Sequence, residues 1–171
     1  MRHTAIVSAV LVTWLLTTPL VWAQKSEEQE HAELAKALPA GKVPLQTGLT
    51  ASQGEGKPIS GKYEVEDGKL QLSVYTVKGG KFSEVIVDHA TGKVSKVEPI
   101  TKPEDLTAAK AQNEAMAKAK RTLDAAVTEA TKANKGFRAV SAYPAMKDGH
   151  PVADVSLVKG TEWKAVSAKL D

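Results

Sequence analysis

The sequence predicts an α+β fold made of two tandem repeats, each with helices packed on one face of a 3-4 stranded antiparallel sheet. Ala-rich segments of good helix formers precede short segments in which apolar and polar residues alternate. Short Gly-containing turns join these strand segments, and strands with such short connections must run antiparallel. The same order of segments occurs twice along the 171 residues, as in proteins with an internal repeat.

The repeat is visible when the two parts of the sequence are aligned. At an offset of 78 residues Leu45 coincides with Leu123, and at an offset of 81 residues Asp67-Gly68 coincides with Asp148-Gly149. Further matches at the second offset join apolar and aromatic positions: Val74 with Val155, Phe82 with Trp163, and Val85 with Val166. We therefore expect a first repeat at residues 24–98, a linker at 99–103 and a second repeat at 104–171.

In the first repeat, Ser26 is placed to cap a helix that runs to about Leu38, with glutamates in its first turn, where the helix dipole favours them. A shorter helix is predicted near Leu45–Gln53. Asp88 is expected to accept hydrogen bonds from backbone amides of the Thr91-Gly92 turn, as Asp does in Asx-turns. The alternating segments predict four strands: Ile59–Val65, Leu70–Val77, Lys81–Asp88 and Lys93–Glu98.

In the second repeat, the segment Glu104–Asn134 is rich in Ala, Lys, Glu and Gln, and Pro103 suits its first turn. Thr122 is suited to cap a new helix at Leu123, so the segment can form one helix or two. The segments after it predict three strands: Phe137–Tyr143, Val152–Val158 and Glu162–Leu170.

These segments resemble the PepSY domain family, whose pattern is an Ala-rich helix ending in Gly, followed by strands that lead to an Asp and a Thr-Gly turn. Leu123–Gly136 matches the helix, and Phe82–Val94, which contains Asp88-His89-Ala90-Thr91-Gly92, matches the closing hairpin. Counting both repeats, the resemblance covers nearly all of residues 24–171. It implies an extracytoplasmic, non-catalytic domain that inhibits or modulates a peptidase. The tandem arrangement also resembles the architecture of the β-lactamase inhibitory protein.

The first 23 residues have the pattern of a secretory signal peptide. Arg2 gives a positive start, Ala5–Leu16 is an apolar run, and Pro19 precedes a cleavage motif at Val21-Trp22-Ala23. The alternative is an uncleaved membrane anchor, since this stretch is just long enough to span a bilayer. Cleavage predicts a periplasmic or secreted protein that meets a membrane only through the signal peptide.

Composition excludes several classes of protein. The chain has no cysteine, which rules out disulfide scaffolds, cysteine zinc fingers, iron–sulfur centres and thiol catalysts. Removing residues 1–23 removes Arg2 and leaves 22 basic against 20 acidic side chains. So small a surplus predicts no nucleic-acid partner.

Motifs for catalysis are not found in the sequence. It contains no G-x-S-x-G elbow, no P-loop, and no G-x-G-x-x-G between a strand and a helix. After the signal peptide the histidines are His31, His89 and His150, which are far apart in the sequence and mostly lie in predicted turns. A metal site needs three or four ligands to converge, so we expect no metal site. Because the catalytic and nucleotide-binding motifs are also missing, we expect no cofactor and no enzymatic activity.

An apolar patch is the main candidate for partner contact. If Val85 and Val87 face the helices, strand alternation turns the side chains at the intervening positions toward the other face of the sheet. The residues of this predicted contact patch are Tyr75, Val77, Phe82 and Ile86 in the first repeat and Trp163 in the second. Exposed apolar patches mark interfaces. Two alternatives remain: the two sheets cover each other, or a bulge near Gly79-Gly80 reverses the faces.

The predicted function is therefore a non-catalytic exported module that binds a protein partner. An inhibitor or modulator of an extracytoplasmic peptidase is one form of this hypothesis. The alternatives are a periplasmic protein that binds a small ligand or a metal, and a passive structural protein of the envelope.

Overall fold

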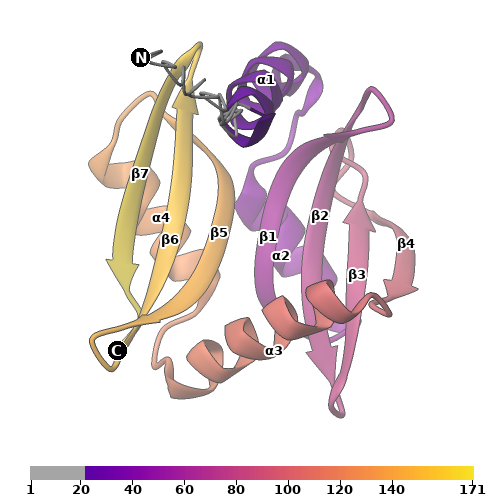
Figure 1. The fold of residues 1–171 in the computed structure, drawn as a ribbon, viewed down its shortest axis with the longest axis vertical. Helices are drawn as coiled ribbons and strands as arrows, with labels where there is room; N and C mark the ends of the chain where they lie inside the picture. Colours follow the sequence, from indigo (N-terminus) through magenta and orange to yellow (C-terminus); the bar gives the residue numbers. More distant parts are fainter. Residues whose placement is uncertain (1–21) are drawn as a thin grey trace, which may run out of the picture.

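The computed structural model describes the backbone of residues 22–171 and the side chains of residues 27–171. The predicted signal peptide, residues 1–23, lies outside the described residues except for its last two. Within this range the chain forms an α+β fold with one seven-stranded antiparallel sheet (Figure 1).

Helices and strands follow one another in the predicted order. The helices are α1 (Trp22–Ala37), η1 (Leu38–Ala40), α2 (Leu45–Ala51), η2 (Ser52–Gly54), α3 (Pro103–Lys118) and α4 (Leu123–Ala133). The strands of the first half are β1 (Lys57–Glu66), β2 (Lys69–Lys78), β3 (Lys81–Val87) and β4 (Val94–Pro99). Those of the second half are β5 (Arg138–Lys147), β6 (His150–Lys159) and β7 (Glu162–Lys169).

The two predicted sheets are in fact one sheet, with the strand order β4-β3-β2-β1-β5-β6-β7. The predicted separation was wrong because β1 and β5 pair at the centre, where Gly61 lies opposite Ala142 and Lys62 lies opposite Ser141. The pairing is short because alternation in β5 turns the backbone nitrogen of Pro144 toward β1. A proline nitrogen has no hydrogen to donate, so the ladder cannot continue past this residue.

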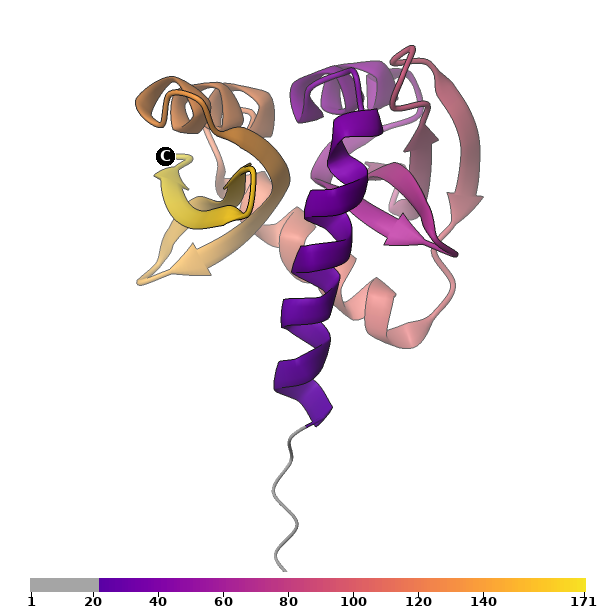
Figure 2. The ribbon, with the colours of Figure 1, turned by 90° about the horizontal axis from the view of Figure 1, so that it is seen from above.

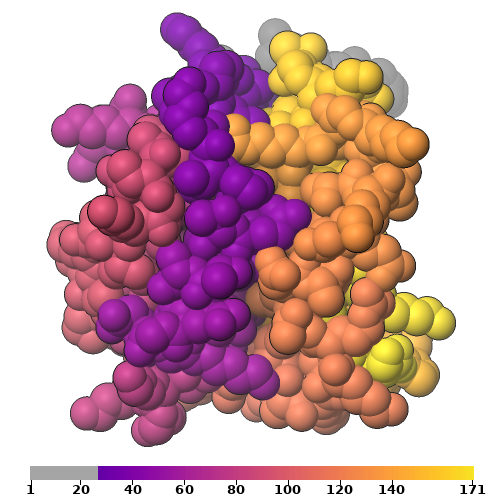
Figure 3. All heavy atoms as spheres, turned by 180° about the vertical axis from the view of Figure 1, so that it is seen from behind, coloured from indigo at the N-terminus to yellow at the C-terminus, as the bar shows by residue number. Residues whose placement is uncertain are grey.

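The helices lie on both faces of the sheet, not on one as predicted. Helices α2 and α4 contact each other on one face, and Figure 3 shows the two halves of the chain meeting along a seam there. Helix α3 crosses the other face against β5, β1 and β6, and α1 lies on that same face over β1 and β2 (Figures 1 and 2). The apolar stripe of α3 consists of Ala109, Ala115 and Met116, which suits a helix lying flat on a mixed surface.

The hydrophobic core lies between the sheet and the pair α2 and α4. Leu45 and Leu49 of α2 and Leu123 of α4 are buried, together with Leu72 of β2 and Leu157 of β6. The added methyl group of an alanine at Gly48 would lie 2.8 Å from Leu72, so α2 sits close against β2. This packing fixes the halves against each other on the α2/α4 face.

The helix boundaries confirm one prediction and correct another. Thr122 caps α4, because its hydroxyl accepts a hydrogen bond from the Ala125 amide at 3.2 Å, and the segment before it forms the separate helix α3. Ser26 is not an N-cap, because α1 already begins at Trp22 and runs through Ser26. The residues before Ser26 include Ala and Gln, which favour a helix and extend it backward.

Positions 81 residues apart occupy equivalent places in the two halves. Asp67 and Asp148 both have a positive φ in the first β-hairpin turn of their half. The pairing shifts between Pro58 and Ser60 in β1 and between Ala139 and Ser141 in β5. The turns and register shifts therefore lie at equivalent positions of the sheet in the two halves. That the halves are tandem repeats of one unit stays a prediction.

Candidate binding cleft

A cleft of about 470 Å³ opens on the α1/α3 face, between the diverging strands β1 and β5. We call it the central cleft. Its lining comes from five elements: Glu30, His31, Glu33 and Leu34 of α1; Lys62–Glu66 of β1; Val140, Ser141 and Tyr143 of β5; Ser156 of β6; and Trp163 of β7. The volume lies within the range of small-ligand sites. The cleft lies where the two halves of the sheet meet.

Arg138 of β5 anchors the segment that follows α1, the helix that lines the cleft. Its guanidinium donates to the carbonyl oxygens of Leu38 at 3.2 Å, Gly41 at 2.7 Å and Val43 at 2.7 Å. The same group lies 4.6 Å from the ring centroid of Tyr63, a cation–π distance. The Tyr63 hydroxyl donates to the Val43 carbonyl at 2.6 Å. A β5 residue thus fixes the segment between α1 and α2.

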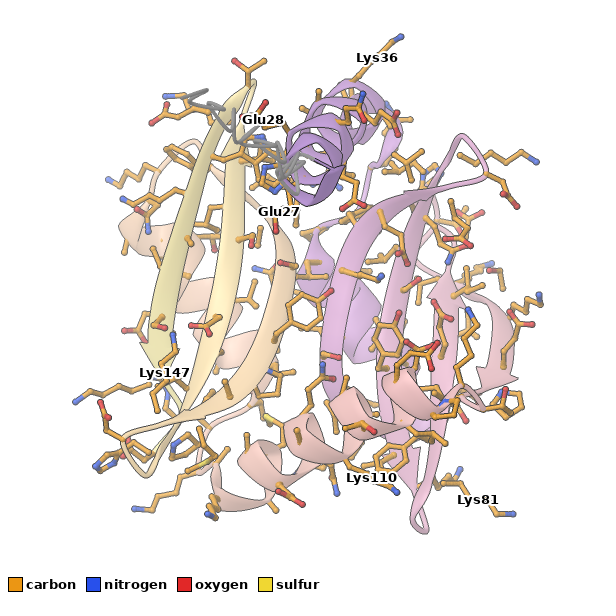
Figure 4. The ribbon with its side chains drawn as sticks, in the orientation of Figure 1. Glu27, Glu28, Lys36, Lys81, Lys110 and Lys147 are labelled. Atoms are coloured by element: carbon orange, nitrogen blue, oxygen red, sulfur yellow. The ribbon has the colours of Figure 1, made fainter. Side chains whose placement is uncertain are left out.

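Helix α1 forms one wall of the cleft. His31 stacks on Trp163 with ring centroids 3.9 Å apart and an angle of 10° between the planes. Toward the sheet Leu34 is half-buried and Leu38 of η1 is buried, whereas the N-terminal part of α1 projects from the body (Figure 2). Glu27 and Glu28 lie on this projecting part (Figure 4). No pattern in the sequence indicated a contact between His31 and Trp163, which is a finding of the structure.

A chain of polar side chains runs from the cleft along β1 and β2. Lys62 forms an ion pair with Glu64, and Glu64 accepts a hydrogen bond of 2.8 Å from the Ser73 hydroxyl. Gln71 donates to the Ser73 oxygen at 2.9 Å. Burial by itself lowers the pKa of Lys62, but the hydrogen bond and the negative charge of Glu64 outweigh burial and raise that pKa. Lys62 is therefore held as a cation.

Two tyrosines lie beside Lys62 beneath α3. Tyr75 and Tyr143 line a chamber of about 170 Å³ together with Lys62 and with Asp105, Ala108, Ala109 and Gln112 of α3. Burial raises the pKa of both tyrosine hydroxyls, and the positive charge of Lys62 opposes this rise. The Ser60 hydroxyl donates to the Gln112 oxygen at 2.6 Å, which attaches α3 to the sheet. Both tyrosines therefore stay neutral at physiological pH.

The residues of the predicted contact patch do not form one open surface. Tyr75 lies in the chamber under α3, Trp163 lies in the central cleft against α1, and both are half-buried. Val77 and Phe82 face each other near the end of the β2–β3 hairpin, and both pack against the core. Ile86 is half-buried at another hollow, beside the β3–β4 turn. Of the five, the structure brings only Trp163 into the central cleft.

The two alternatives for this patch are also resolved. The halves do not cover each other face to face, because they share one sheet. The register shift in β1 lies between Pro58 and Ser60, and the Gly79-Gly80 turn closes a regular hairpin in which Lys78 lies opposite Lys81. Alternation therefore continues through that turn, and it is this chain's own helices α1 and α3 that cover the sheet face.

The sequence did not single out the polar residues of the cleft. Lys62, Glu64 and Tyr143 lie at alternate strand positions, which are typical of a solvated face. Nothing in the spacing shows that β1 and β5 are neighbours. Their convergence depends on one long-range strand pair, and no local pattern encodes such a pair.

The predicted Asx-turn at Asp88 is confirmed. One carboxylate oxygen accepts hydrogen bonds from the amides of Ala90 at 2.9 Å and Thr91 at 2.7 Å, and from the Thr91 hydroxyl at 2.9 Å. The backbone and side-chain hydrogen bonds of Thr91 lower the pKa of Asp88, and the Ala90 amide adds to this shift. Asp88 thus fixes the β3–β4 turn and is not among the residues that line the central cleft.

The three histidines of the described residues do not converge. His31 lies on α1, the His89 Nδ1 atom is buried without a hydrogen-bond partner, and His150 bonds Asp171 at 2.6 Å. Within residues 27–171, no group of three or more His, Cys, Asp or Glu side chains is placed to hold a metal ion. None of the described helices is both long enough and apolar enough to cross a membrane.

Comparisons with known proteins return no match: no protein-family model, no curated protein and no solved structure matches this chain.

Proposed function

We propose that the protein is a non-catalytic, exported module that binds a protein partner through the central cleft. The observation that carries this proposal is the cleft itself, which lies where the two halves of one sheet meet and takes residues from both. Two of its titratable groups, Lys62 and Glu64, pair with each other, an arrangement that suits a recognition surface. A peptidase is one candidate partner, as the PepSY resemblance implies.

The charges of the cleft favour a basic group on the partner. Four glutamates line it: Glu30, Glu33, Glu64 and Glu66. Lys62 neutralises Glu64, which leaves three carboxylates in a lining that also includes the aromatic rings of Trp163 and Tyr143. A Lys or Arg side chain is attracted both by carboxylates and by aromatic faces. We infer that the partner places such a side chain in the cleft.

We also infer that the chain arose by duplication of one unit of helices and strands. Equivalent geometry at positions 81 residues apart supports this inference. The amides of Lys42 and Val43 donate to the His89 carbonyl at 2.7 and 3.1 Å. In the second half, the amides of Lys120 and Arg121 donate to the Leu170 carbonyl at 2.7 and 3.0 Å. Two copies of one unit, paired through β1 and β5, would create the cleft at their junction.

The test is capture of a partner from an envelope extract by tagged residues 24–171, combined with charge variants. Glu33→Lys places a like charge against a basic partner group and is expected to weaken capture by about tenfold or more. Glu27→Lys is the matched control, because Glu27 lies on the projecting part of α1 and is absent from the lining. A stoichiometric partner retained by Glu27→Lys and lost by Glu33→Lys supports the proposal. An empty capture at several salt concentrations, or equal capture by both variants, contradicts it.

A second hollow favours the small-ligand alternative. It has a volume of about 360 Å³ and lies between α2, the start of β1 and the loop from α3 to α4. Leu49, Pro58, Met116 and Leu123 give it an apolar floor, while Lys57 and Arg121 lie among its lining residues. A molecule with an apolar chain and an anionic group suits this lining. A rise in melting temperature with decanoate but not with decanol would support this second function.

A further inference from the structure

The outer edge of β7 carries backbone groups without a strand partner in the described part of the chain. Strands β6 and β7 pair regularly from Lys159 opposite Glu162 to Val152 opposite Lys169. The two-residue turn makes Lys159 and Glu162 a hydrogen-bonded pair. Alternation then directs the backbone N–H and C=O groups of Trp163, Ala165 and Ser167 away from β6. Within residues 22–171 no strand lies beyond β7.

The first half of the sheet shows what covers the equivalent edge. Strand β3 lies 81 residues before β7, and β4 pairs with its outer side. The Ile100 amide donates to the Phe82 carbonyl at 3.0 Å, and the Ser95 hydroxyl donates to the Ile86 carbonyl at 3.0 Å. Phe82 and Ile86 are the counterparts of Trp163 and Ser167. An antiparallel strand is therefore the natural occupant of this position.

The two outer edges of the sheet differ in their protection. Strand β4 is poorly suited to pair with a strand of another chain, because its pairing with β3 shifts between Ile86 and Val87 and because it ends at Pro99. Natural edge strands are protected in these ways against pairing with other chains. Strand β7 has eight residues, no proline and no shift in its pairing with β6. The Lys164 ammonium donates a hydrogen bond to the side chain of Asn134, the C-cap residue of α4, so this charge does not protect the edge against pairing with another strand.

We propose that the outer edge of β7 binds an extended segment of a partner protein as an additional antiparallel strand, with an apolar residue opposite Val166. This inference goes beyond the central cleft and does not depend on it. Val97 of β4 lies opposite Val85, and Val166 is the counterpart of Val85. Val166 is half-buried on the side of the sheet that α4 covers. An apolar partner residue at this position would complete that packing, as in other cases of strand addition.

The test uses residues 24–171 and a synthetic peptide with the sequence of residues 93–100, which includes β4. This peptide carries the pattern that covers the equivalent edge. We expect it to cause saturable amide chemical-shift changes at Trp163, Ala165 and Ser167. Ala165→Pro removes one outward N–H group and leaves the pairing with β6 intact, because proline is tolerated on the free side of an edge strand. Losing that hydrogen bond and the close approach of the strand is expected to weaken binding about tenfold or more.

Ala165→Thr is the matched control, because it keeps the N–H group and favours a strand. Peptide binding retained by Ala165→Thr and lost by Ala165→Pro supports the proposal, provided that both variants unfold at the same urea concentration. Equal binding by both variants, or shifts at residues of the central cleft with none at Ala165 and Ser167, overturns it. A dimer that Ala165→Pro dissociates also overturns it, since the occupant is then a second copy of this chain. Capture through the cleft is unaffected by Ala165→Pro, so the two proposals fail separately.

Discussion

Gly61 and Ala142 lie opposite each other where β1 pairs with β5, and they are separated by 81 positions in the sequence. The small side chains at this point allow Leu45 and Leu49 of α2 to lie directly over the sheet. A Cβ atom at Gly61 would come within 3.2 Å of Leu49 and 3.4 Å of Leu45. The close packing of α2 over β1 therefore lies at the point where β1 pairs with β5.

Replacing Gly61 by a larger residue is expected to destabilise the protein. Gly61→Val forces α2 away from β1 and should lower the free energy of unfolding by about 1–3 kcal/mol, the usual effect of overpacking. Gly54→Val is the control, because no atom lies within 4 Å of the Cβ position at Gly54. Urea unfolding measures both. Equal losses in the two variants would contradict the close contact at Gly61.

Arg138 is expected to be the most important charged residue for stability. Arg138→Ala leaves the carbonyls of Leu38, Gly41 and Val43 without this donor and should cost about 2–4 kcal/mol of unfolding free energy. Arg138→Lys keeps the charge but cannot reach several carbonyls at once, so it should recover only part of the loss. Urea unfolding of the two variants tests this order. Full recovery by lysine would show that charge alone is sufficient.

The stack of His31 on Trp163 is expected to shield the indole ring from solvent. In residues 24–171, Trp163 is the one tryptophan, so its fluorescence reports on this contact alone. His31→Ala should shift the emission to longer wavelength and increase quenching by acrylamide. Glu27→Ala, on the projecting part of α1, should leave both unchanged. An unchanged spectrum in His31→Ala would show that α1 does not rest on Trp163 in solution.

Asp88 is expected to make stability depend on acid pH. Hydrogen bonds lower its pKa in the folded protein, so its contribution is present above the pKa of the unfolded chain, about 3.9, and is lost as pH falls through the lower folded value. Asp88→Ala should therefore be less stable than the parent chain at pH 6, and the difference should shrink below about pH 4. Urea midpoints across this range measure it. A constant difference would contradict the assignment.

Lys62 has the opposite dependence. Because its pKa is raised in the folded protein, its contribution is fully present below the unfolded value, about 10.4, and is lost as pH rises through the folded value. At neutral pH, Lys62→Met leaves Glu64 without its cation and should cost about 1–3 kcal/mol of unfolding free energy. Adding Glu64→Gln should recover part of that loss. A double-mutant cycle with no coupling between the two sites would refute the pair.

Local patterns predicted most of the secondary structure, because each hairpin turn and helix cap is a short-range signal. Asp67-Gly68, Asp88 and Thr122 each determine a nearby turn or cap, and each occupies the expected place. The union of the two sheets depends on Gly61 and Ala142, which carry no local sign of their pairing. The central cleft could not be predicted for the same reason, since its two sides come from strands that only this contact makes neighbours.

The strand order also has a consequence for how fast and in what sequence the chain folds. Every neighbouring pair of strands except β1 and β5 is joined by one turn, so most strand contacts are local along the chain. Among the strand pairings, only that of β1 with β5 must close a loop of about 80 residues, and such contacts are slow to form. The two halves should therefore become ordered independently, and their docking should be the late, rate-limiting event of folding.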